Sequence, residues 1–254
     1  MANKFAALTV ALALFAGPAM AQDDGPPRPQ LPALSLNAQM TDAQIGAALD
    51  PWLAGLQRDD VFNGALLVAR NGQEIFAHAY GSRDIASNTA LGVDDRFPIA
   101  SIVKAFTHVA VAQLIQQGRL TPETTIADII PDYPNAVSRT ATVAQLLGHE
   151  GGIADIFGPA FRAIPKEQLS SNHAYYALVA QQPPMFAPGA GNEYCNGCYV
   201  VLGEIIERVS GQSYEQYVAT HVFTPAGMTR SGFLRSDQLP ADAAHFTGHP
   251  SGPD

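Results

Sequence analysis

Residues Phe97–Phe106 read FPIASIVKAF, an apolar stretch in which a serine and a lysine lie three positions apart. Residues at this spacing share one face of a helix, so Ser101 and Lys104 can touch if a helix begins at the serine. A serine hydroxyl is a weak nucleophile at neutral pH and needs a nearby base. Burial disfavours the charged form of lysine and lowers its pKa, so a lysine in dry surroundings can be that base.

The rest of this segment predicts a buried helix. It runs from Ser101 to Gln117 and ends at Gly118, and its apolar residues leave little of its surface polar. A second interpretation is purely structural: Lys104 extends to the surface, and Ser101 only caps the helix. The short S-x-x-K pattern alone does not separate these two interpretations.

On the N-terminal side of this helix, the chain predicts a helix followed by a hairpin. Thr41 or Asp42 can cap a helix through Leu56. The runs FNGALLVAR and QEIFAHAYG then flank Asn71-Gly72, the strongest short hairpin signal because a type I′ turn needs positive φ at both central residues. Little strand signal follows. Further helices are expected over residues 143–147, 172–181, 197–210 and 214–222.

The first 21 residues resemble a secretory signal peptide. Lys4 supplies a positive start, the apolar run from Phe5 to Ala16 is too short to span a bilayer, and Ala19-Met20-Ala21 fits a cleavage site. We expect cleavage after Ala21 and a periplasmic or secreted protein. Repeated prolines predict a linker over residues 22–40, so the folded domain is expected over residues 41–254.

Charge and hydropathy exclude several partners. The formal net charge is -9, and no block of basic residues occurs, which argues against nucleic acid and anionic membrane surfaces. No later apolar run is long enough for stable membrane insertion. The expected partner is a small-molecule or peptide substrate, and no pattern indicates an oligomeric state.

A second group of polar residues lies in residues 186–211, FAPGAGNEYCNGCYVVLGEIIERVSG. Tyr194 and Asn196 stand where a loop enters a helix. A tyrosine hydroxyl can relay a proton if a nearby cation lowers its pKa, and an asparagine amide can hold a substrate carbonyl. The alternative is structural, with tyrosine as a packing residue and asparagine as a cap.

Cys195 and Cys198 form a C-x-x-C pattern that admits three interpretations. A redox dithiol would need an exposed, thioredoxin-like setting, and a disulfide is permitted by an oxidising compartment, but a reduced buried pair is the expectation. No second C-x-x-C and no H-E-x-x-H occurs, so no metal or cofactor is expected. The absence of G-x-S-x-G argues against an ordinary α/β-hydrolase.

Five segments in this order resemble the class C β-lactamase family of penicillin-recognising serine hydrolases, which includes D-alanyl-D-alanine carboxypeptidases and esterases. They are FNGALLVARNGQEIFAHAYG, FPIASIVKAF, LLGHEGGIADIF, the 186–211 stretch and FTPAGM. The resemblance implies an α+β fold, in which helices flank an antiparallel sheet and a helical subdomain is added. In this chain we expect that sheet to be incomplete.

The resemblance also implies roles for four residues. Ser101 would be the acylated nucleophile, and its backbone N–H would form half of the oxyanion hole. Lys104 would be its hydrogen-bonding base. Tyr194 would pass protons to the leaving group and from the deacylating water. Asn196 would hold the substrate amide and orient Lys104. Acyl transfer requires a nucleophile, a base and hydrogen-bond donors where negative charge develops, and these residues would supply them.

This sequence departs from the family pattern in three places. Cys195 replaces the usual serine, and the common H-T-S-G run is replaced by HEGG at residues 149–152. No K-T-G follows, and HFTG at residues 245–248 is too close to FTPAGM to be the third motif. We therefore expect a C-terminally truncated chain with weak or no activity alone.

Two functions follow from these patterns. The first is an exported serine hydrolase that cleaves a β-lactam, a D-alanyl peptide or a small ester through an acyl-serine. The alternative is a non-catalytic penicillin- or peptide-binding module that keeps the pocket.

Overall fold

A computed structural model describes residues 31–84, 87–235 and 237–245. The chain divides into two compact units, one comprising Met1–Asp95 with Asp242–Asp254 and the other Arg96–Ala241. The predicted signal peptide and the first part of the predicted linker lie outside the described residues.

The first unit begins with α1 (Asp42–Arg58), as predicted. Thr41 caps it through a reciprocal pair of hydrogen bonds: the Gln44 N–H donates to Thr41 Oγ1 (3.3 Å), and the Thr41 N–H donates to Gln44 Oε1 (2.8 Å). This capping box satisfies two backbone donors that a helix start otherwise leaves without partners. The buried residues follow the predicted face: Ile45, Leu49, Leu53 and Leu56.

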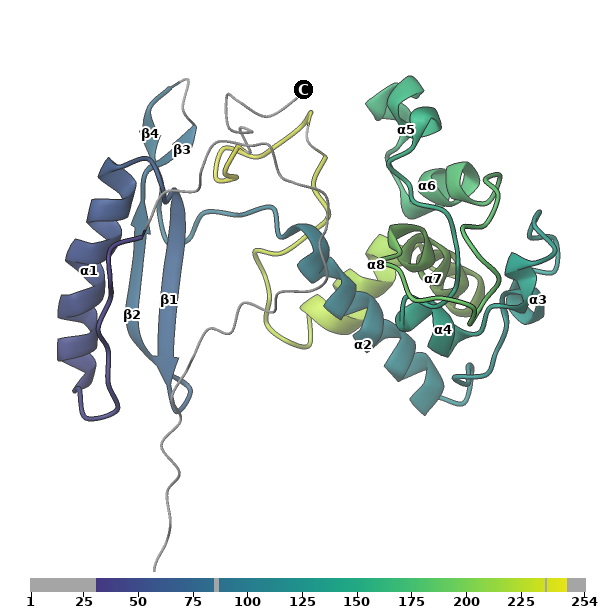
Figure 1. Cartoon of the computed structure of the whole chain (residues 1–254), viewed down its shortest axis with the longest axis horizontal. Coiled ribbons are helices and arrows are strands. Elements are labelled where there is room, and N and C mark those ends of the chain that lie inside the picture. The colour runs from purple at the N-terminus through teal and green to yellow at the C-terminus, as the bar shows by residue number, and fades with distance from the viewer. Residues whose placement is uncertain (1–30, 85–86, 236, 246–254) are drawn as a thin grey trace, which may run out of the picture. The chain divides into compact units, whose positions relative to one another are not determined.

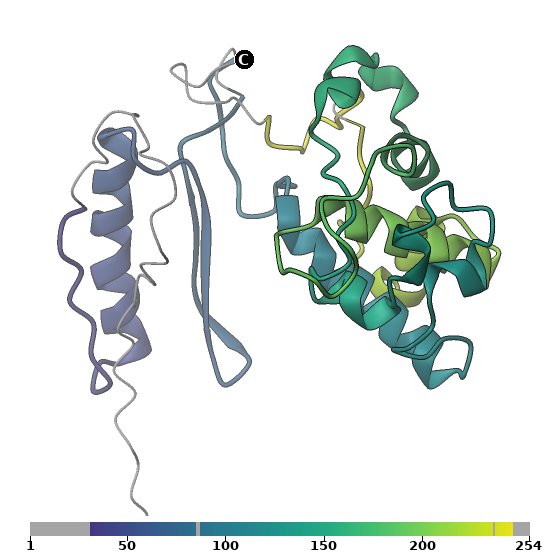
Figure 2. The ribbon, with the colours of Figure 1, turned by 45° about the vertical axis from the view of Figure 1, so that its right-hand side comes forward.

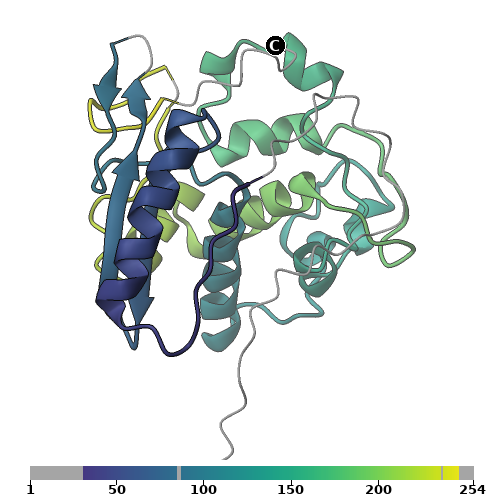
Figure 3. The same ribbon diagram turned by 60° about the vertical axis from the view of Figure 1, so that its left-hand side comes forward.

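The predicted hairpin follows as β1 (Gly64–Arg70) and β2 (Gln73–Tyr80), which pair antiparallel. Asn71 and Gly72 have φ values of 52° and 77°, as a type I′ turn requires. Figure 3 shows α1 lying along the hairpin, and Phe76 of β2 forms one core with Ile45, Leu49 and Leu53 of α1. Two short strands that the sequence did not indicate, β3 (Ser82–Asp84) and β4 (Thr89–Ala90), form a second small sheet.

The second unit is helical and is built around α7 (Asn196–Ser210). The α-helices α2, α3, α4, α6 and α8 all contact α7, and Figures 1 and 2 show them grouped together. The predicted helices at residues 143–147 and 172–181 are present, the second ending at Val179. The bounds are α2 (Val103–Gln116), α3 (Ile126–Ile129), α4 (Val143–Leu147), α5 (Pro159–Ala163), α6 (Asn172–Val179) and α8 (Tyr214–Val218).

Four shorter helical segments complete this unit. Three are 3₁₀ turns: η1 (Ala100–Ile102), η2 (Ser138–Thr140) and η3 (Lys166–Gln168). The fourth, η4 (Ala219–Phe223), is a π-helix that continues α8, so the helix predicted to Val222 changes its hydrogen-bonding pattern after Val218.

One charged residue lies deep in α7. Glu204 is 1% exposed, and Arg208 Nε donates a hydrogen bond to its Oε1 (2.8 Å). His173 Nδ1 of α6 lies 2.9 Å from Oε2 of the same carboxylate. A buried carboxylate is tolerated when both oxygens have partners, so this group also links α6 to α7.

The prediction that the helix after Ser101 is buried on most sides is wrong. Thr107, Ala110, Val111 and Leu114 of α2 are buried, whereas Ile102 just before it is 65% exposed and Val109 is 42% exposed. The apolar residues surround the helix, but its neighbours in this unit cover one side of it. The helix does end as expected, because Gly118 adopts a positive φ of 69° after the last turn.

The chain combines helices with small antiparallel sheets, so its fold class is α+β, as predicted. Within the described ranges, no helix combines the length and apolar character needed to cross a bilayer.

Candidate active site

Ser101 lies in the 3₁₀ turn η1, directly before α2. Ala100 precedes it with a φ of 44°, a left-handed conformation that is uncommon for a residue with a side chain. Lys104 is in the first turn of α2, and its Nζ donates a hydrogen bond to Ser101 Oγ (3.3 Å). The predicted contact between this serine and this lysine is therefore present.

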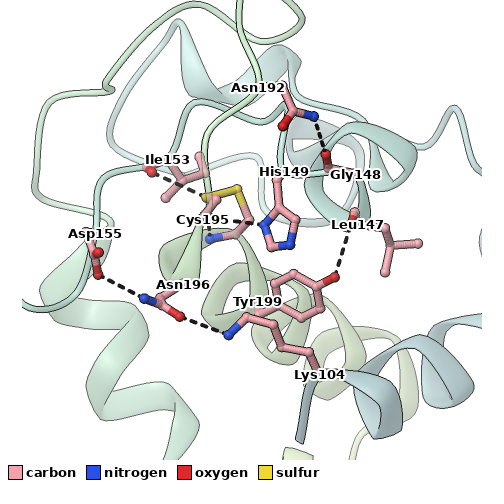
Figure 4. Close-up of a disulfide and its surroundings, with 11 residues drawn as sticks. Lys104, Leu147, Gly148, His149, Ile153, Asp155, Asn192, Cys195, Asn196 and Tyr199 are labelled. Carbon is pink, nitrogen blue, oxygen red and sulfur yellow. Dashed lines mark hydrogen bonds between the residues drawn. A yellow bond between two sulfur atoms is a disulfide. The ribbon is translucent and has the colours of Figure 1, made fainter. Parts of the chain in front are cut away.

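Tyr194 and Asn196, from the second motif at residues 186–211, complete the group. Tyr194 Oη donates a hydrogen bond to Ser101 Oγ (2.5 Å). Lys104 Nζ donates to Asn196 Oδ1 (2.9 Å), a contact visible in Figure 4. The ammonium also lies over the ring of Tyr194, 4.6 Å from its centroid. The structure brings together all four residues singled out from the sequence.

The structural alternatives for Ser101 and Lys104 do not match this geometry. The Ser101 side chain makes no capping hydrogen bond to α2, and the Lys104 amine points to Ser101 and Asn196 rather than away from them. Lys104 is half-buried and Ser101 is exposed. The Lys104 amine contacts the polar side chains of Ser101 and Asn196 and lies over the rings of Tyr194 and Tyr199. That its surroundings are dry enough to leave it uncharged stays a prediction.

The surroundings of Tyr194 favour loss of its hydroxyl proton. Its hydrogen bonding with Lys104, then that with Ser101, lowers the pKa of the phenol below its ordinary value. Tyr194 is 54% exposed, so burial opposes this effect only weakly. A phenolate in contact with the serine hydroxyl can accept its proton.

Cys195 and Cys198 form a disulfide, and both are fully buried, so the expectation of a reduced pair is wrong. The two residues lie at the first turn of α7, where positions three apart face the same side. The Cys198 N–H points to Cys195 Sγ (3.0 Å), so Cys195 also caps the helix. The bridge therefore fixes the backbone on which Tyr194 and Asn196 are placed.

We expect Cys195→Ala to cost more stability than Cys195→Ser, although both remove the disulfide. Closing so short a loop contributes about 2 kcal/mol in the chain-entropy estimate. Serine keeps an oxygen that accepts from the Cys198 N–H, and losing a cap costs about 1 kcal/mol more. Guanidinium unfolding without reductant measures both differences. Equal free energies of unfolding for the two variants would contradict the capping role.

Two residues without a predicted role lie beside the site. The Cys195 N–H donates to His149 Nδ1 (3.0 Å), and the His149 ring stacks on Tyr194 with centroids 4.9 Å apart. Asn196 Nδ2 donates to Asp155 Oδ1 (3.3 Å). Both belong to LLGHEGGIADIF, a motif that marked the family resemblance but indicated no function for either residue.

Burial, then the positive charges of Lys104 and His108, lower the pKa of His149. The imidazole is therefore neutral near pH 7, which is the state in which Nδ1 can accept a hydrogen bond.

One group in the second unit has the composition of a metal site. Ligand atoms of His173, Glu204 and Glu207 lie within 4.8 Å of one another. The Glu204 oxygens already face Arg208 and His173, and the Tyr214 N–H donates to Glu207 Oε1 (2.9 Å). These contacts account for the cluster as a link between α6, α7 and α8.

An α+β chain with a serine, a lysine, a tyrosine and an asparagine in this arrangement has the features of a serine hydrolase of the β-lactamase and penicillin-binding class. A family model described as Beta-lactamase matches residues 49–254, and the chain belongs to this family. Penicillin-binding protein 4* of Bacillus subtilis (strain 168) is 28% identical over 187 residues, 73% of this chain and 41% of that protein.

Solved structures agree on the fold. A penicillin-binding protein from Bacillus halodurans has a TM-score of 0.67 and 31% identity, over 76% of this chain and 59% of that one. A D-amino acid amidase from Ochrobactrum anthropi SV3 has a TM-score of 0.60 and 26% identity, over 71% of this chain and 51% of that one. The chain thus spans about two-fifths of the length of its curated relative and about half to three-fifths of these structures.

Proposed function

We propose that the chain carries the nucleophile and the proton-transfer groups of an exported serine hydrolase that cleaves an amide or ester through an acyl-serine. The observation that carries this proposal is the position of Ser101 Oγ, which contacts Tyr194 Oη and Lys104 Nζ at once. Such an arrangement provides a nucleophile with a proton acceptor and a cation beside it.

We assign the proton transfers of the reaction to Tyr194. Tyr194, as phenolate, takes the proton of Ser101 while Oγ forms a bond to the substrate carbonyl carbon. The resulting phenol gives that proton to the leaving amine or alkoxide as the carbonyl re-forms. Water then attacks the acyl-serine carbonyl while Tyr194 accepts a proton from it, and Tyr194 returns this proton to Ser101 Oγ as the bond between Oγ and the acyl carbon breaks. The cycle consumes one water and yields a carboxylic acid and an amine or alcohol.

Lys104 is assigned a supporting part. Its amine donates to Asn196 Oδ1 (2.9 Å) and to Ser101 Oγ (3.3 Å), so it links two members of the site. Its position favours the phenolate of Tyr194, as the lowered pKa of Tyr194 indicates. Asn196, held by Lys104 through Oδ1, keeps one hydrogen of Nδ2 for donation to a substrate carbonyl, while the other is donated to Asp155. This proposal differs from the role that the family resemblance implies for Lys104, in which Lys104 is the base.

Three substrate classes fit this chemistry: β-lactams, D-alanyl peptides and small esters. The resemblance to class C β-lactamases supports the first two. The likeness to a D-amino acid amidase supports amides of D-amino acids more generally. None of these reactions needs a metal, because the nucleophile and proton acceptor are side chains.

Export is part of the proposal. It is supported by the signal-peptide pattern of residues 1–21 and by the disulfide, since disulfides persist in oxidising compartments.

The test is covalent labelling of Ser101. A fluorescent penicillin or a fluorophosphonate is expected to label the protein, and Ser101→Ala is expected to abolish that labelling because no other atom takes the role of Oγ. Labelling should be measured on the 254-residue chain and on a version extended at its C-terminus to the length of its relatives.

Labelling that survives in Ser101→Ala would overturn the proposal. If neither version is labelled although both bind penicillin reversibly, the non-catalytic binding module is the better account. Hydrolysis of nitrocefin compared with p-nitrophenyl acetate would then order the substrates of a labelled protein.

A further inference from the structure

We propose that His149 and Asp155 are positioning residues, which hold Tyr194 and Asn196 respectively in their orientations toward Ser101. This inference deepens the proposed function and rests on it for the roles of Tyr194 and Asn196. Both positioning residues come from one segment, residues 148–157, here called the bracing segment.

His149 restrains Tyr194 through two contacts. Its Nδ1 accepts a hydrogen bond from the backbone N–H of Cys195, the residue after Tyr194 (3.0 Å). Its ring stacks against the Tyr194 ring at an interplanar angle of 29°. One contact fixes the backbone and the other limits rotation of the side chain, so together they restrict where Tyr194 Oη can lie. Figure 4 shows the imidazole beside Cys195.

His149 must be neutral at Nδ1 for this contact, and its surroundings favour that state. The groups that face it are Lys104 and His108 of α2, Tyr194, and Tyr199 of α7. Burial and the two basic neighbours lower its pKa. Protonation at low pH would turn Nδ1 from an acceptor into a donor and break the bond to Cys195.

Asp155 fixes which way the Asn196 amide points. Asn196 Oδ1 accepts from Lys104 Nζ (2.9 Å), and Asn196 Nδ2 donates to Asp155 Oδ1 (3.3 Å), as Figure 4 shows. Turning the amide over would place its NH₂ against the ammonium and its oxygen against the carboxylate. Both contacts would be repulsive, so the cation and the anion together select one orientation. The second Nδ2 hydrogen stays available for a substrate.

The bracing segment lies tightly against the start of α7. A Cβ at Gly197 would collide with the Ala154 carbonyl oxygen, and one at Gly151 would come within 3.1 Å of Cys198 Sγ. The Glu193 N–H also donates to the His149 carbonyl (3.2 Å). Backbone contacts this close transmit the position of one segment to the other, which a positioning role requires.

His149 can be tested by two variants that separate its two contacts. His149→Asn keeps an acceptor close to the place of Nδ1 and tolerates the φ of 63°, but loses the ring. His149→Phe keeps a ring and loses the acceptor. We expect exchange of the Cys195 amide hydrogen, followed by NMR on the 254-residue chain, to accelerate at least tenfold in His149→Phe and to stay near the original rate in His149→Asn.

Labelling of Ser101 should likewise be affected more by His149→Phe than by His149→Asn. A misplacement of about 1 Å costs about 10²-fold in rate, so fluorophosphonate labelling of Ser101 should slow by 10- to 100-fold in His149→Phe and less in His149→Asn. The ¹³C titration of the Tyr194 phenol should move toward the ordinary tyrosine pKa in His149→Phe, because Oη moves away from Lys104 and Ser101. A role confined to stability would lower the melting temperature and leave this titration in place.

Asp155 has its own pair of variants. Asp155→Ala removes the acceptor, and we expect faster solvent exchange of the Asn196 side-chain NH₂ with at least tenfold slower labelling. Asp155→Asn retains a carbonyl acceptor and should recover most of the labelling rate. Unchanged exchange at Asn196 in Asp155→Ala would overturn the role of Asp155, and unchanged exchange at Cys195 in His149→Phe would overturn that of His149.

These outcomes are distinct from failure of the proposed function. If the unmodified chain is never labelled, the hydrolase proposal fails, while the two exchange measurements still decide whether the bracing segment holds Tyr194 and Asn196.

Discussion

Replacing Tyr194 by phenylalanine is expected to slow acylation of Ser101 by about 10³-fold, within the 10²- to 10⁴-fold range typical of general acid–base groups. The change removes the oxygen that donates to Ser101 Oγ (2.5 Å) and leaves the ring. Cation–π contact with Lys104 and stacking on His149 are therefore retained. A large loss in this variant would reflect the proton transfer and not a collapse of the site.

The pH dependence gives this prediction a second readout. Hydrogen bonding with Lys104, then with Ser101, lowers the pKa of Tyr194, so the phenolate forms at a lower pH than for a free tyrosine. The rate of labelling should rise with pH and level off above that pKa, with a midpoint below 10. In Tyr194→Phe this ascending limb should disappear. The measurement is the rate of fluorophosphonate labelling between pH 6 and pH 10.

Tyr199→Phe is the matched control. Tyr199 also lies near Lys104, with the ammonium 5.3 Å from its ring centroid, but burial raises its pKa and its hydroxyl donates to the Leu147 carbonyl (3.0 Å). The ascending limb should survive in this variant with its midpoint in place. If the limb instead survives in Tyr194→Phe, Tyr194 is not the proton acceptor. Lys104 then becomes the base, and Lys104→Arg, which cannot lose its proton, should abolish labelling.

The elements that depend on local patterns could be predicted from the sequence. The helix cap at Thr41, the Asn71-Gly72 turn and the end of α2 at Gly118 are each set by a few adjacent residues, and all three are present. The contact between Ser101 and Lys104 also follows from short-range helical geometry. The sequence indicated Tyr194 and Asn196 as separate candidates for proton relay and carbonyl binding. Their association with Ser101 and Lys104 followed only from the ordered motifs of a family, because no local rule connects residues more than 90 positions apart.

What the sequence could not indicate depends on tertiary contacts. The exposure of Ile102 and Val109 is decided by which helices pack on α2, and apolar composition does not determine that. The disulfide depends on the backbone geometry at the start of α7. His149 and Asp155 lie 46 and 41 residues from the groups they contact, and a histidine or an aspartate in a loop has no distinctive spacing to mark it.

Gly197→Ala is expected to destabilise the chain by about 3 kcal/mol, the upper part of the range for adding a methyl group to a packed interior. The added Cβ would collide with the Ala154 carbonyl oxygen and lie 2.9 Å from Ile153 Cγ2. A backbone oxygen cannot rotate away as a flexible side chain can, so the start of α7 or the bracing segment must shift. Asn196 immediately precedes the substituted position, and we expect labelling of Ser101 to fall with stability.

Two further glycine-to-alanine changes give a graded comparison by guanidinium unfolding. Gly232→Ala has no atom within 4 Å of the new Cβ and no positive φ, so it should change the free energy of unfolding by less than about 0.5 kcal/mol. Gly211→Ala is equally unobstructed but has a φ of 77° after α7, and the left-handed backbone alone should cost about 1 kcal/mol. If Gly197→Ala costs no more than Gly211→Ala, the bracing segment can move without penalty, and the close contact of residues 153–154 with α7 does not hold the site in place.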